Sequence, residues 1–221
     1  MSYVYLIGGA TGIGTSRIAL GLAMEEDIKV KSVIGTDSLR AALRKVIGRG
    51  VCPPLFYSSF DGDLGAEEGW IPFNDDIDMV IAAYEEQARL ICTAVTGVIE
   101  RAWREELNII IEGVHISPRQ MDNMLDGELR ERVIQVVIDI EDEELHRQRL
   151  LERKSRSRRR KYVRHLKNFA DVRRLRKHII EQAKEHDVAI IQNDRPSEEV
   201  VSEVKEYLFA SMPTNGKRLK K

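Results

Sequence analysis

Near its start the chain carries a glycine-rich stretch whose residue types and spacing are suited to binding phosphate. It has the outline of the loop G-x-x-x-x-G-K-[ST], in which backbone N–H groups surround phosphate oxygens and the last hydroxyl coordinates Mg²⁺. The stretch runs Gly9, Ala10, Thr11, Gly12, Ile13, Gly14, Thr15, Ser16. Thr15 stands where the lysine is expected, and a threonine supplies no positive charge. The stretch predicts a nucleotide-phosphate site with Ser16 as a Mg²⁺ ligand. A dinucleotide-binding turn, or a tight turn without a ligand, remains an alternative.

Two carboxylates follow apolar segments further along the chain. Asp37 comes after "VKSVIGT" and Glu112 closes "NIII". A phosphoryl acceptor needs a carboxylate to orient its hydroxyl and take its proton, and we predict this role for Asp37. Asp37 could instead cap the helix expected over "SLRAALR". A carboxylate after a buried strand is costly unless it is paired or bound to metal, so Glu112 is predicted to support Mg²⁺ or to share the base role.

A small anionic acceptor would need basic and polar side chains around it. Arg40 and Arg44 lie one helical turn apart after Asp37, and Arg89 lies on a long amphipathic helix pattern. We predict that these arginines clamp the acceptor, although each could equally pair with a nearby glutamate on the surface. The last candidates for substrate contact, in an irregular segment, are Tyr57 and Ser58.

The densest basic run of the chain lies between residues 149 and 167. From Arg153 to Lys167 it contains nine lysines or arginines and no acidic residue. Arginines neutralise the charge that develops on a transferring phosphoryl group, so Arg153 and Arg156 are predicted to act from a lid and to replace the missing lysine. A nucleic-acid patch and an ordinary solvated helix face remain alternatives for this run.

The elements that must position these residues are short apolar strands alternating with helical patterns. Strands are expected at 3–8, 30–37, 108–113, 133–140 and 188–194. Apolar strands separated by helices predict an α/β fold of the phosphate-loop NTPase type, with a five-stranded parallel sheet flanked by helices. Ligands bind such sheets at the carboxyl ends of the strands, where the loop, Asp37 and Glu112 fall. Asn193 also follows a strand, the fifth, where a strand-ending turn would account for it.

Length and composition predict a single globular unit. The 221 residues are 43% hydrophobic and 32% charged, with a formal net charge of −1, which argues against a generally basic nucleic-acid binder. We expect one phosphate-loop domain over 1–211, with an excursion on the acceptor side at about 48–75, a lid at about 150–168 and a flexible basic tail at 212–221. The start of the chain contains no leader pattern and no run is long enough to span a membrane, so a cytoplasmic protein is expected.

In order along the chain, a set of motifs resembles the archaeal-type 2-phosphoglycerate kinases, which are phosphate-loop kinases related to the nucleoside monophosphate kinases. The motifs lie between about residues 3 and 194 and read "GGATGIGTSRIA", "GTDSLRAALR", "LFYSSF", "EEQARLI", "IIIEGVHISP", "DIEDEELHRQRLLER", "YVRHLKNFADVRRL" and "IIQND". The ordered set is fairly specific to this family, whereas each motif alone is not.

The resemblance implies a reaction that the residues alone do not identify. It implies transfer of the ATP γ-phosphate, with Mg²⁺, to the 3-hydroxyl of 2-phosphoglycerate, which gives 2,3-bisphosphoglycerate. The likeness to related kinases also implies that Asn193 borders the adenine. The partner expected is therefore a small phosphorylated molecule rather than a nucleic acid or a membrane, and the oligomeric state is left open. Two alternatives are a nucleoside or nucleotide kinase, and a non-catalytic nucleotide-binding regulator whose basic run binds RNA.

Overall fold

The computed structural model describes residues 2–60, 69, 78–156 and 161–212, and of residues 153–156 and 161–163 it describes the backbone only. Five parallel strands form one sheet in the order β2-β3-β1-β4-β5. The strands are β1 (Val4–Gly8), β2 (Ser32–Gly35), β3 (Ile109–Gly113), β4 (Val133–Asp139) and β5 (Ala189–Gln192). This confirms the predicted five-stranded parallel sheet. Every residue of the central strand β1 is buried, as expected for a strand covered on both faces.

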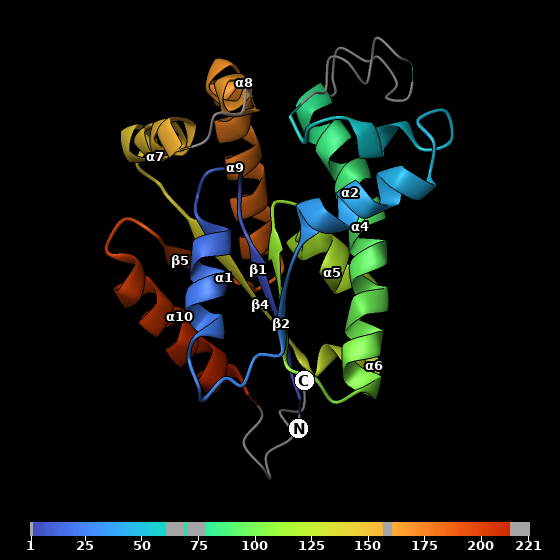
Figure 1. Cartoon of the computed structure of the whole chain (residues 1–221), viewed down its shortest axis with the longest axis vertical. Coiled ribbons are helices and arrows are strands. Elements are labelled where there is room, and N and C mark those ends of the chain that lie inside the picture. Colours follow the sequence, from blue (N-terminus) through green and yellow to red (C-terminus); the bar gives the residue numbers. More distant parts are fainter. Residues whose placement is uncertain (1, 61–68, 70–77, 157–160, 213–221) are drawn as a thin grey trace.

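Helices cover both faces of the sheet (Figure 1). Helices α1 and α10 pack against each other on one face, while α4, α5 and α9 pack together on the other. The helical elements are α1 (Thr15–Ala23), α2 (Thr36–Val46), the 3₁₀ turn η1 (Pro53–Phe56), α4 (Met79–Arg104), α5 (Pro118–Met124), α6 (Gly127–Arg130), α7 (Glu143–Arg156), α8 (Lys161–Lys167), α9 (Phe169–Glu185) and α10 (Ser197–Ser211). In the part of the chain that the structure describes, no helix combines the length and apolar character needed to cross a membrane.

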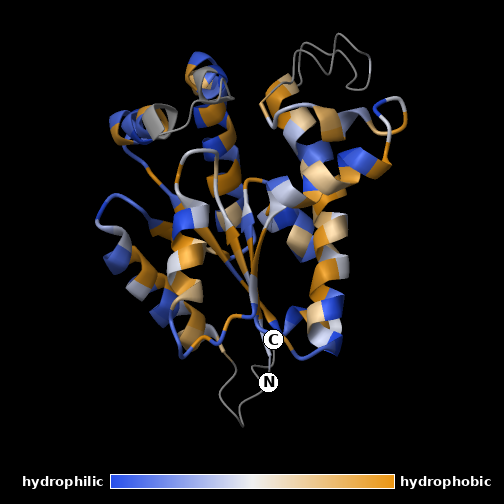
Figure 2. Cartoon of the chain, viewed as in Figure 1, coloured by the Kyte–Doolittle hydropathy of each residue, from blue (hydrophilic) through white to orange (hydrophobic). Residues whose placement is uncertain are grey.

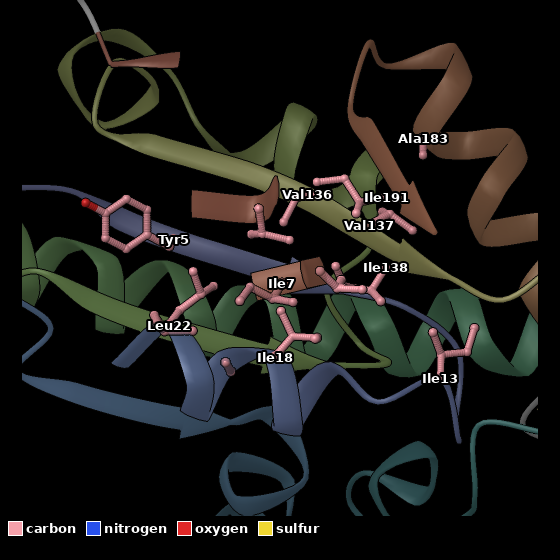
Figure 3. Close-up of a cluster of buried hydrophobic side chains, with 14 of the residues drawn as sticks. Tyr5, Ile7, Ile13, Ile18, Leu22, Val136, Val137, Ile138, Ala183 and Ile191 are labelled. Atoms are coloured by element: carbon pink, nitrogen blue, oxygen red, sulfur yellow. The ribbon is translucent and has the colours of Figure 1, made fainter. Parts of the chain in front are cut away.

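Alternating side chains of the strands build the core on the two faces of the sheet. In β1, Tyr5 and Ile7 belong to one apolar cluster, whereas Val4 and Leu6 belong to another, because successive side chains of a strand point to opposite faces. Figure 3 shows the first cluster, in which Ile18 of α1 lies against the strands. Figure 2 shows hydrophobic residues concentrated along the central strands. The core therefore fixes the strands whose carboxyl ends carry the polar side chains.

The strands are slightly shorter than predicted, and one difference concerns a candidate site residue. Strand β2 ends at Gly35 and α2 begins at Thr36, so Asp37 lies in the first turn of a helix rather than at the end of a strand. Gly35 is the N-cap of α2, so Asp37 is not the capping residue. The long helix α4 begins at Met79 because the Asp78 carboxylate accepts hydrogen bonds from the N–H groups of residues 80 and 81. Residues 61–68 and 70–77 of the predicted excursion lie outside the described residues.

Candidate active site

The glycine-rich loop joins β1 to the first turn of α1, as the motif requires. Gly9 has a φ of 153°, and a Cβ there would lie 2.6 Å from the Ile138 carbonyl oxygen. Gly14 has a φ of 104°, and a Cβ there would lie 2.8 Å from Asn193 Nδ2. Both positions therefore require glycine, since a side chain would be strained and would collide with neighbours. The loop leads directly into the N-terminus of α1, where free N–H groups attract anions.

Asn193, which follows β5, holds the glycine-rich loop in place through hydrogen bonds. Its amide Nδ2 donates a hydrogen bond to the Ile13 carbonyl oxygen at 2.7 Å, and the residue is 1% exposed. Its backbone N–H donates to the Asp139 carbonyl oxygen at 2.7 Å, which fixes the start of the turn after β5. The side chain predicted to border an adenine is thus engaged with the loop backbone in this structure.

Helix α7 supports the tip of the loop through His146. The ring Nε2 lies 2.9 Å from the Thr11 carbonyl oxygen, and Nδ1 lies 3.5 Å from an Arg173 guanidinium nitrogen. A carbonyl can only accept and a guanidinium can only donate, so the arrangement selects the neutral tautomer with its proton on Nε2. Burial lowers the pKa of His146 below its ordinary value, and the nearby arginine charges add to this effect, although the bond to Thr11 opposes it. The loop tip is therefore fixed by a histidine that is neutral at pH 7.

Glu112 connects the end of β3 to the loop. Its Oε2 accepts a hydrogen bond from the Thr15 hydroxyl at 2.7 Å, and its Oε1 accepts one from the Ser16 hydroxyl at 2.9 Å. The residue in the lysine position thus contacts the carboxylate predicted to support the metal. Ser16 and Glu112 together offer a hydroxyl and a carboxylate oxygen on adjacent positions, which are ligand types that Mg²⁺ accepts alongside phosphate oxygens and water.

Ser16 and Glu112 fit a metal ion whose remaining ligands come from a nucleotide, rather than a metal ion held by protein side chains alone. Among the described residues there is no group of three or more His, Cys, Asp or Glu side chains able to hold a metal ion. Mg²⁺ in phosphoryl-transfer sites is commonly held by one or two protein oxygens together with substrate phosphates and water. Ser16 and Glu112 match this pattern.

A pocket brings the loop, Asp37 and Glu112 together. Its lining consists of Gly9, Ala10, Thr11, Gly12, Gly14, Thr15, Ser16, Thr36, Asp37, Glu112, Gly113, Val114 and His165. The Asp37 side chain is 61% exposed, and its Oδ1 lies 3.5 Å from an Arg40 guanidinium nitrogen. An exposed carboxylate at the rim of a phosphate pocket is placed where an acceptor hydroxyl could reach it.

A smaller pocket adjoins the first and contains acceptor-side candidates. Its lining consists of Thr11, Asp37, Arg40, Ser58, Ser59, Phe60, Gln87, Val114, His115 and His165. Arg40 donates to the carbonyl oxygens of Tyr57 at 2.6 Å and Leu55 at 3.3 Å, so its guanidinium is fixed in orientation. The Tyr57 hydroxyl accepts from Arg49 at 2.8 Å rather than lining either pocket.

His115 belongs to the framework beneath this second pocket. It is 1% exposed, with Nδ1 3.1 Å from the Thr36 hydroxyl and Nε2 2.8 Å from Gln87 Oε1. Gln87 in turn donates to the carbonyl oxygens of Pro54 at 2.5 Å and Tyr57 at 3.0 Å. This buried network ties β3, α2, α4 and the 3₁₀ turn together, so it sets the position of the acceptor side relative to the loop.

Two predicted clamps point elsewhere. The Arg44 guanidinium lies over the Phe56 ring, 4.9 Å from its centroid. Arg89 forms a bidentate pair with Glu86 on the same helix at 2.7 and 3.0 Å, and this pairing raises the pKa of Arg89. Neither arginine is among the described residues that line the two pockets. Arg89 thus forms the surface pair with a glutamate that was the alternative to acceptor binding, whereas Arg44 contacts an aromatic ring instead.

Positive charge does lie beside the loop, from a residue that the sequence analysis did not single out. Arg149 Nη1 lies 3.8 Å from the position that a Cβ on Gly14 would occupy. Partial burial lowers the pKa of Arg149, and the charge of Arg17 nearby lowers it further. The positive charges of Arg149 and Arg17 create a positive potential at the entrance to α1, which favours an anion there. The side chains of Arg153 and Arg156 lie outside the described residues.

Three site residues escaped the sequence analysis: His146, Arg149 and His165. His146 and Arg149 are three residues apart on α7, so they share one face of the helix, and this spacing in "HRQR" was the available signal. His165 is the only histidine within the basic run at 149–167. The density of arginines in this run led to a prediction for the arginines and not for the histidine. The predicted lid concerned Arg153 and Arg156, and none of His146, Arg149 and His165 was singled out within this region.

Known proteins similar to this chain include several archaeal kinases. The 2-phosphoglycerate kinase of Methanocaldococcus jannaschii is 36% identical over 199 residues, which cover 89% of this chain and 60% of that protein. The 2-phosphoglycerate kinase of Methanopyrus kandleri is 30% identical over 221 residues, covering 99% of this chain and 64% of that protein. That of Thermococcus kodakarensis is 34% identical over 190 residues, covering 85% and 60%. The resemblance to this family predicted from the motifs is thereby confirmed over most of the chain.

The chain spans about three fifths of the length of these relatives. No protein-family model matches it.

Solved structures of small-molecule kinases share the fold. Shikimate kinase from Acinetobacter baumannii superposes with a TM-score of 0.53 at 15% identity, covering 97% of this chain and 96% of that one. A sugar kinase from Janibacter sp. also gives a TM-score of 0.53, at 16% identity, covering 97% of this chain and 100% of that one. At such identities the likeness concerns the fold alone. It confirms the phosphate-loop α/β fold predicted from the sequence.

Proposed function

We propose, from the similarity to 2-phosphoglycerate kinases and from the pocket at the loop, that this protein is an ATP-dependent kinase of a small phosphorylated hydroxy acid. Its acceptor would be 2-phosphoglycerate and its product 2,3-bisphosphoglycerate. The observation that carries the proposal is the meeting of the loop, Glu112 and Asp37 in one pocket. A protein that only bound nucleotide would need the loop but would not need an exposed carboxylate at the pocket rim.

The loop and the start of α1 would bind the nucleotide phosphates. Backbone N–H groups at the entrance to a helix attract phosphate, and Arg149 beside Gly14 adds positive charge. Ser16 and Glu112 would hold Mg²⁺, which neutralises charge on the transferring group when it is bound. With a threonine in the lysine position, Arg149 and the predicted lid residues Arg153 and Arg156 would supply the remaining charge.

Asp37 would orient the acceptor hydroxyl and take its proton as the new bond to phosphorus forms. Arg40 lies next to Asp37 with its orientation fixed by backbone carbonyls, so it would bind an anionic group of the acceptor. Ser58 lines the same small pocket and would donate a hydrogen bond there. The proposal includes a single kinase domain over residues 1–211. The cytoplasmic location remains a prediction from the sequence.

The test is ADP release from ATP and Mg²⁺, measured with and without 2-phosphoglycerate. We expect acceptor-dependent release in the wild type and a loss of about 100-fold or more in Asp37→Asn, since removal of a positioned base costs about 10²–10⁴-fold in rate. Glu86→Gln is a matched control, because it also removes one carboxylate but from a surface pair with Arg89. Absence of turnover with 2-phosphoglycerate, 3-phosphoglycerate, glycerate and a nucleotide panel would overturn the kinase proposal. RNA binding by the basic run, with steep salt dependence, would then be measured next.

A further inference from the structure

Helix α8 places one side chain where the two pockets meet. The loop pocket and the acceptor-side pocket share four lining residues, which are Thr11, Asp37, Val114 and His165. A phosphoryl group that moves from a nucleotide on the loop to an acceptor beside Asp37 must pass this junction. The residues at the junction are therefore the ones positioned to touch the transferring group.

The chemistry of these four residues differs. Val114 is apolar, Asp37 carries a negative charge and Thr11 offers a hydroxyl. His165 is the one member of the four whose side chain can donate a hydrogen bond from a ring N–H and can carry positive charge. Phosphoryl oxygens are anionic acceptors, so the imidazole is the complementary group for them, while Asp37 is complementary to the acceptor hydroxyl.

Packing holds the His165 ring at the junction. The residue is 6% exposed, and its ring meets the Phe60 ring edge-on with centroids 5.3 Å apart. Phe60 is itself buried and belongs to an apolar cluster with Val80 of α4 and Val172 of α9. The imidazole is therefore held by an aromatic contact on the acceptor side, which limits its freedom before any ligand binds.

We propose that His165 is a catalytic residue that donates a hydrogen bond to a non-bridging oxygen of the transferring phosphoryl group. In the step, the bond from the γ-phosphorus to the oxygen shared with the β-phosphate breaks, and a bond from that phosphorus to the acceptor oxygen forms. The acceptor proton goes to Asp37, and ADP leaves with the bond electrons. His165 keeps its own proton throughout. This inference rests on the proposed kinase function. His165 was not among the residues that the sequence predicted to contact the acceptor or the transferring group.

Two substitutions separate hydrogen bonding from packing. His165→Phe keeps an aromatic ring against Phe60 but removes the donor, whereas His165→Gln restores an N–H donor. We expect His165→Phe to lower the acceptor-dependent kcat about 10- to 100-fold, the effect of one lost hydrogen bond to a charged oxygen, with the KM for ATP within about 3-fold. His165→Gln should recover part of this loss. His186→Phe is the matched control, because that half-buried ring bonds Asp122 at 2.8 Å and lines a pocket at the opposite end of the strands. It should leave kcat within about 3-fold.

A kcat for His165→Phe within 3-fold of wild type would overturn the proposal, and so would a His165→Gln enzyme no faster than His165→Phe. These rates are measured with whichever acceptor of the panel supports wild-type turnover, so a wrong acceptor assignment does not mask the result.

A binding measurement covers the case in which no acceptor is turned over. Calorimetry should show that His165→Phe binds ADP and Mg²⁺ with fluoroaluminate, a mimic of the transferring group, at least 10-fold more weakly than wild type. Its affinity for ADP and Mg²⁺ alone should stay within about 3-fold. Equal losses for both ligands, or no loss for either, would show that the ring is structural and would overturn the proposal.

Discussion

Glu112→Gln is the substitution that most directly probes the connection between β3 and the loop. In the wild type, Glu112 accepts from Thr15 at 2.7 Å and from Ser16 at 2.9 Å. A hydrogen bond to a charged group contributes about 1.5–3 kcal/mol and one between neutral groups about 0.5–1.5 kcal/mol. A glutamine has one accepting oxygen and a nitrogen that only donates, so one bond weakens and the other is lost.

The two effects together amount to about 2–4 kcal/mol, and the half-buried position of Glu112 places the expected loss toward the lower value because water screens the charge. Because both bonds are present without nucleotide, this loss should lower the free energy of unfolding. A fall in kcat/KM for ATP of about 30-fold or more is expected to the extent that the displaced loop and the lost charge no longer hold phosphate and Mg²⁺ in the transition state. Because Glu112 is also expected to hold Mg²⁺, the Mg²⁺ concentration for half-maximal rate should rise as well.

The assay is ADP release over a matrix of ATP and Mg²⁺ concentrations, with Glu86→Gln as the control that changes charge on the surface. A Glu112→Gln enzyme whose kcat/KM and Mg²⁺ dependence both remain within 3-fold of wild type would refute the reasoning. Neither the loop nor the metal would then depend on the Glu112 carboxylate.

Three further outcomes are expected. Asn193→Ala should lower the free energy of unfolding by about 1–3 kcal/mol, measured by urea denaturation, because the buried Ile13 carbonyl loses its donor; an unchanged midpoint would contradict this. His146→Gln should flatten the pH dependence of stability: since the folded pKa of His146 lies below the unfolded value of about 6.5, wild-type stability should fall as the pH drops through and below 6.5. Equal slopes for the two proteins would argue that Thr11 and His146 do not form the neutral contact. Thr15→Lys should place an ammonium beside Glu112 and lower the KM for ATP; a higher KM would show that the Thr15–Glu112 bond matters more than the added charge.

Much of the fold followed from local sequence signals. The five apolar strands and the helices between them were predicted because each strand reads as a short apolar run, and the central strands β1 and β3 are buried along most of their length. The boundary at Asp37 was wrong because "IGTD" carries no strong stop signal, and α2 begins at Thr36 without a side-chain cap. In the fold, the Thr36 hydroxyl lies 3.1 Å from His115 Nδ1, a tertiary contact that the local sequence does not encode.

The candidate site was predictable in its centre and not at its edges. The loop and Glu112 lie at strand ends, where topology alone brings them together. The predictions for Arg44 and Arg89 depended on which way their side chains point from their helices. Arg44 lies over Phe56 of the 3₁₀ turn, and Arg89 pairs with Glu86 of the same helix. His165 reaches the pocket only through the tertiary packing of α8 on Phe60, which no local pattern encodes.

The proposed reaction is the transfer of a phosphoryl group from ATP to 2-phosphoglycerate. Phosphorus NMR of a reaction containing ATP, Mg²⁺ and 2-phosphoglycerate tests it most directly, because the method identifies the product as well as the turnover. The account predicts the resonances of 2,3-bisphosphoglycerate growing in step with those of ADP, and their loss with Asp37→Asn. ADP accompanied only by inorganic phosphate, or an unchanged spectrum from the folded wild-type protein, would contradict it.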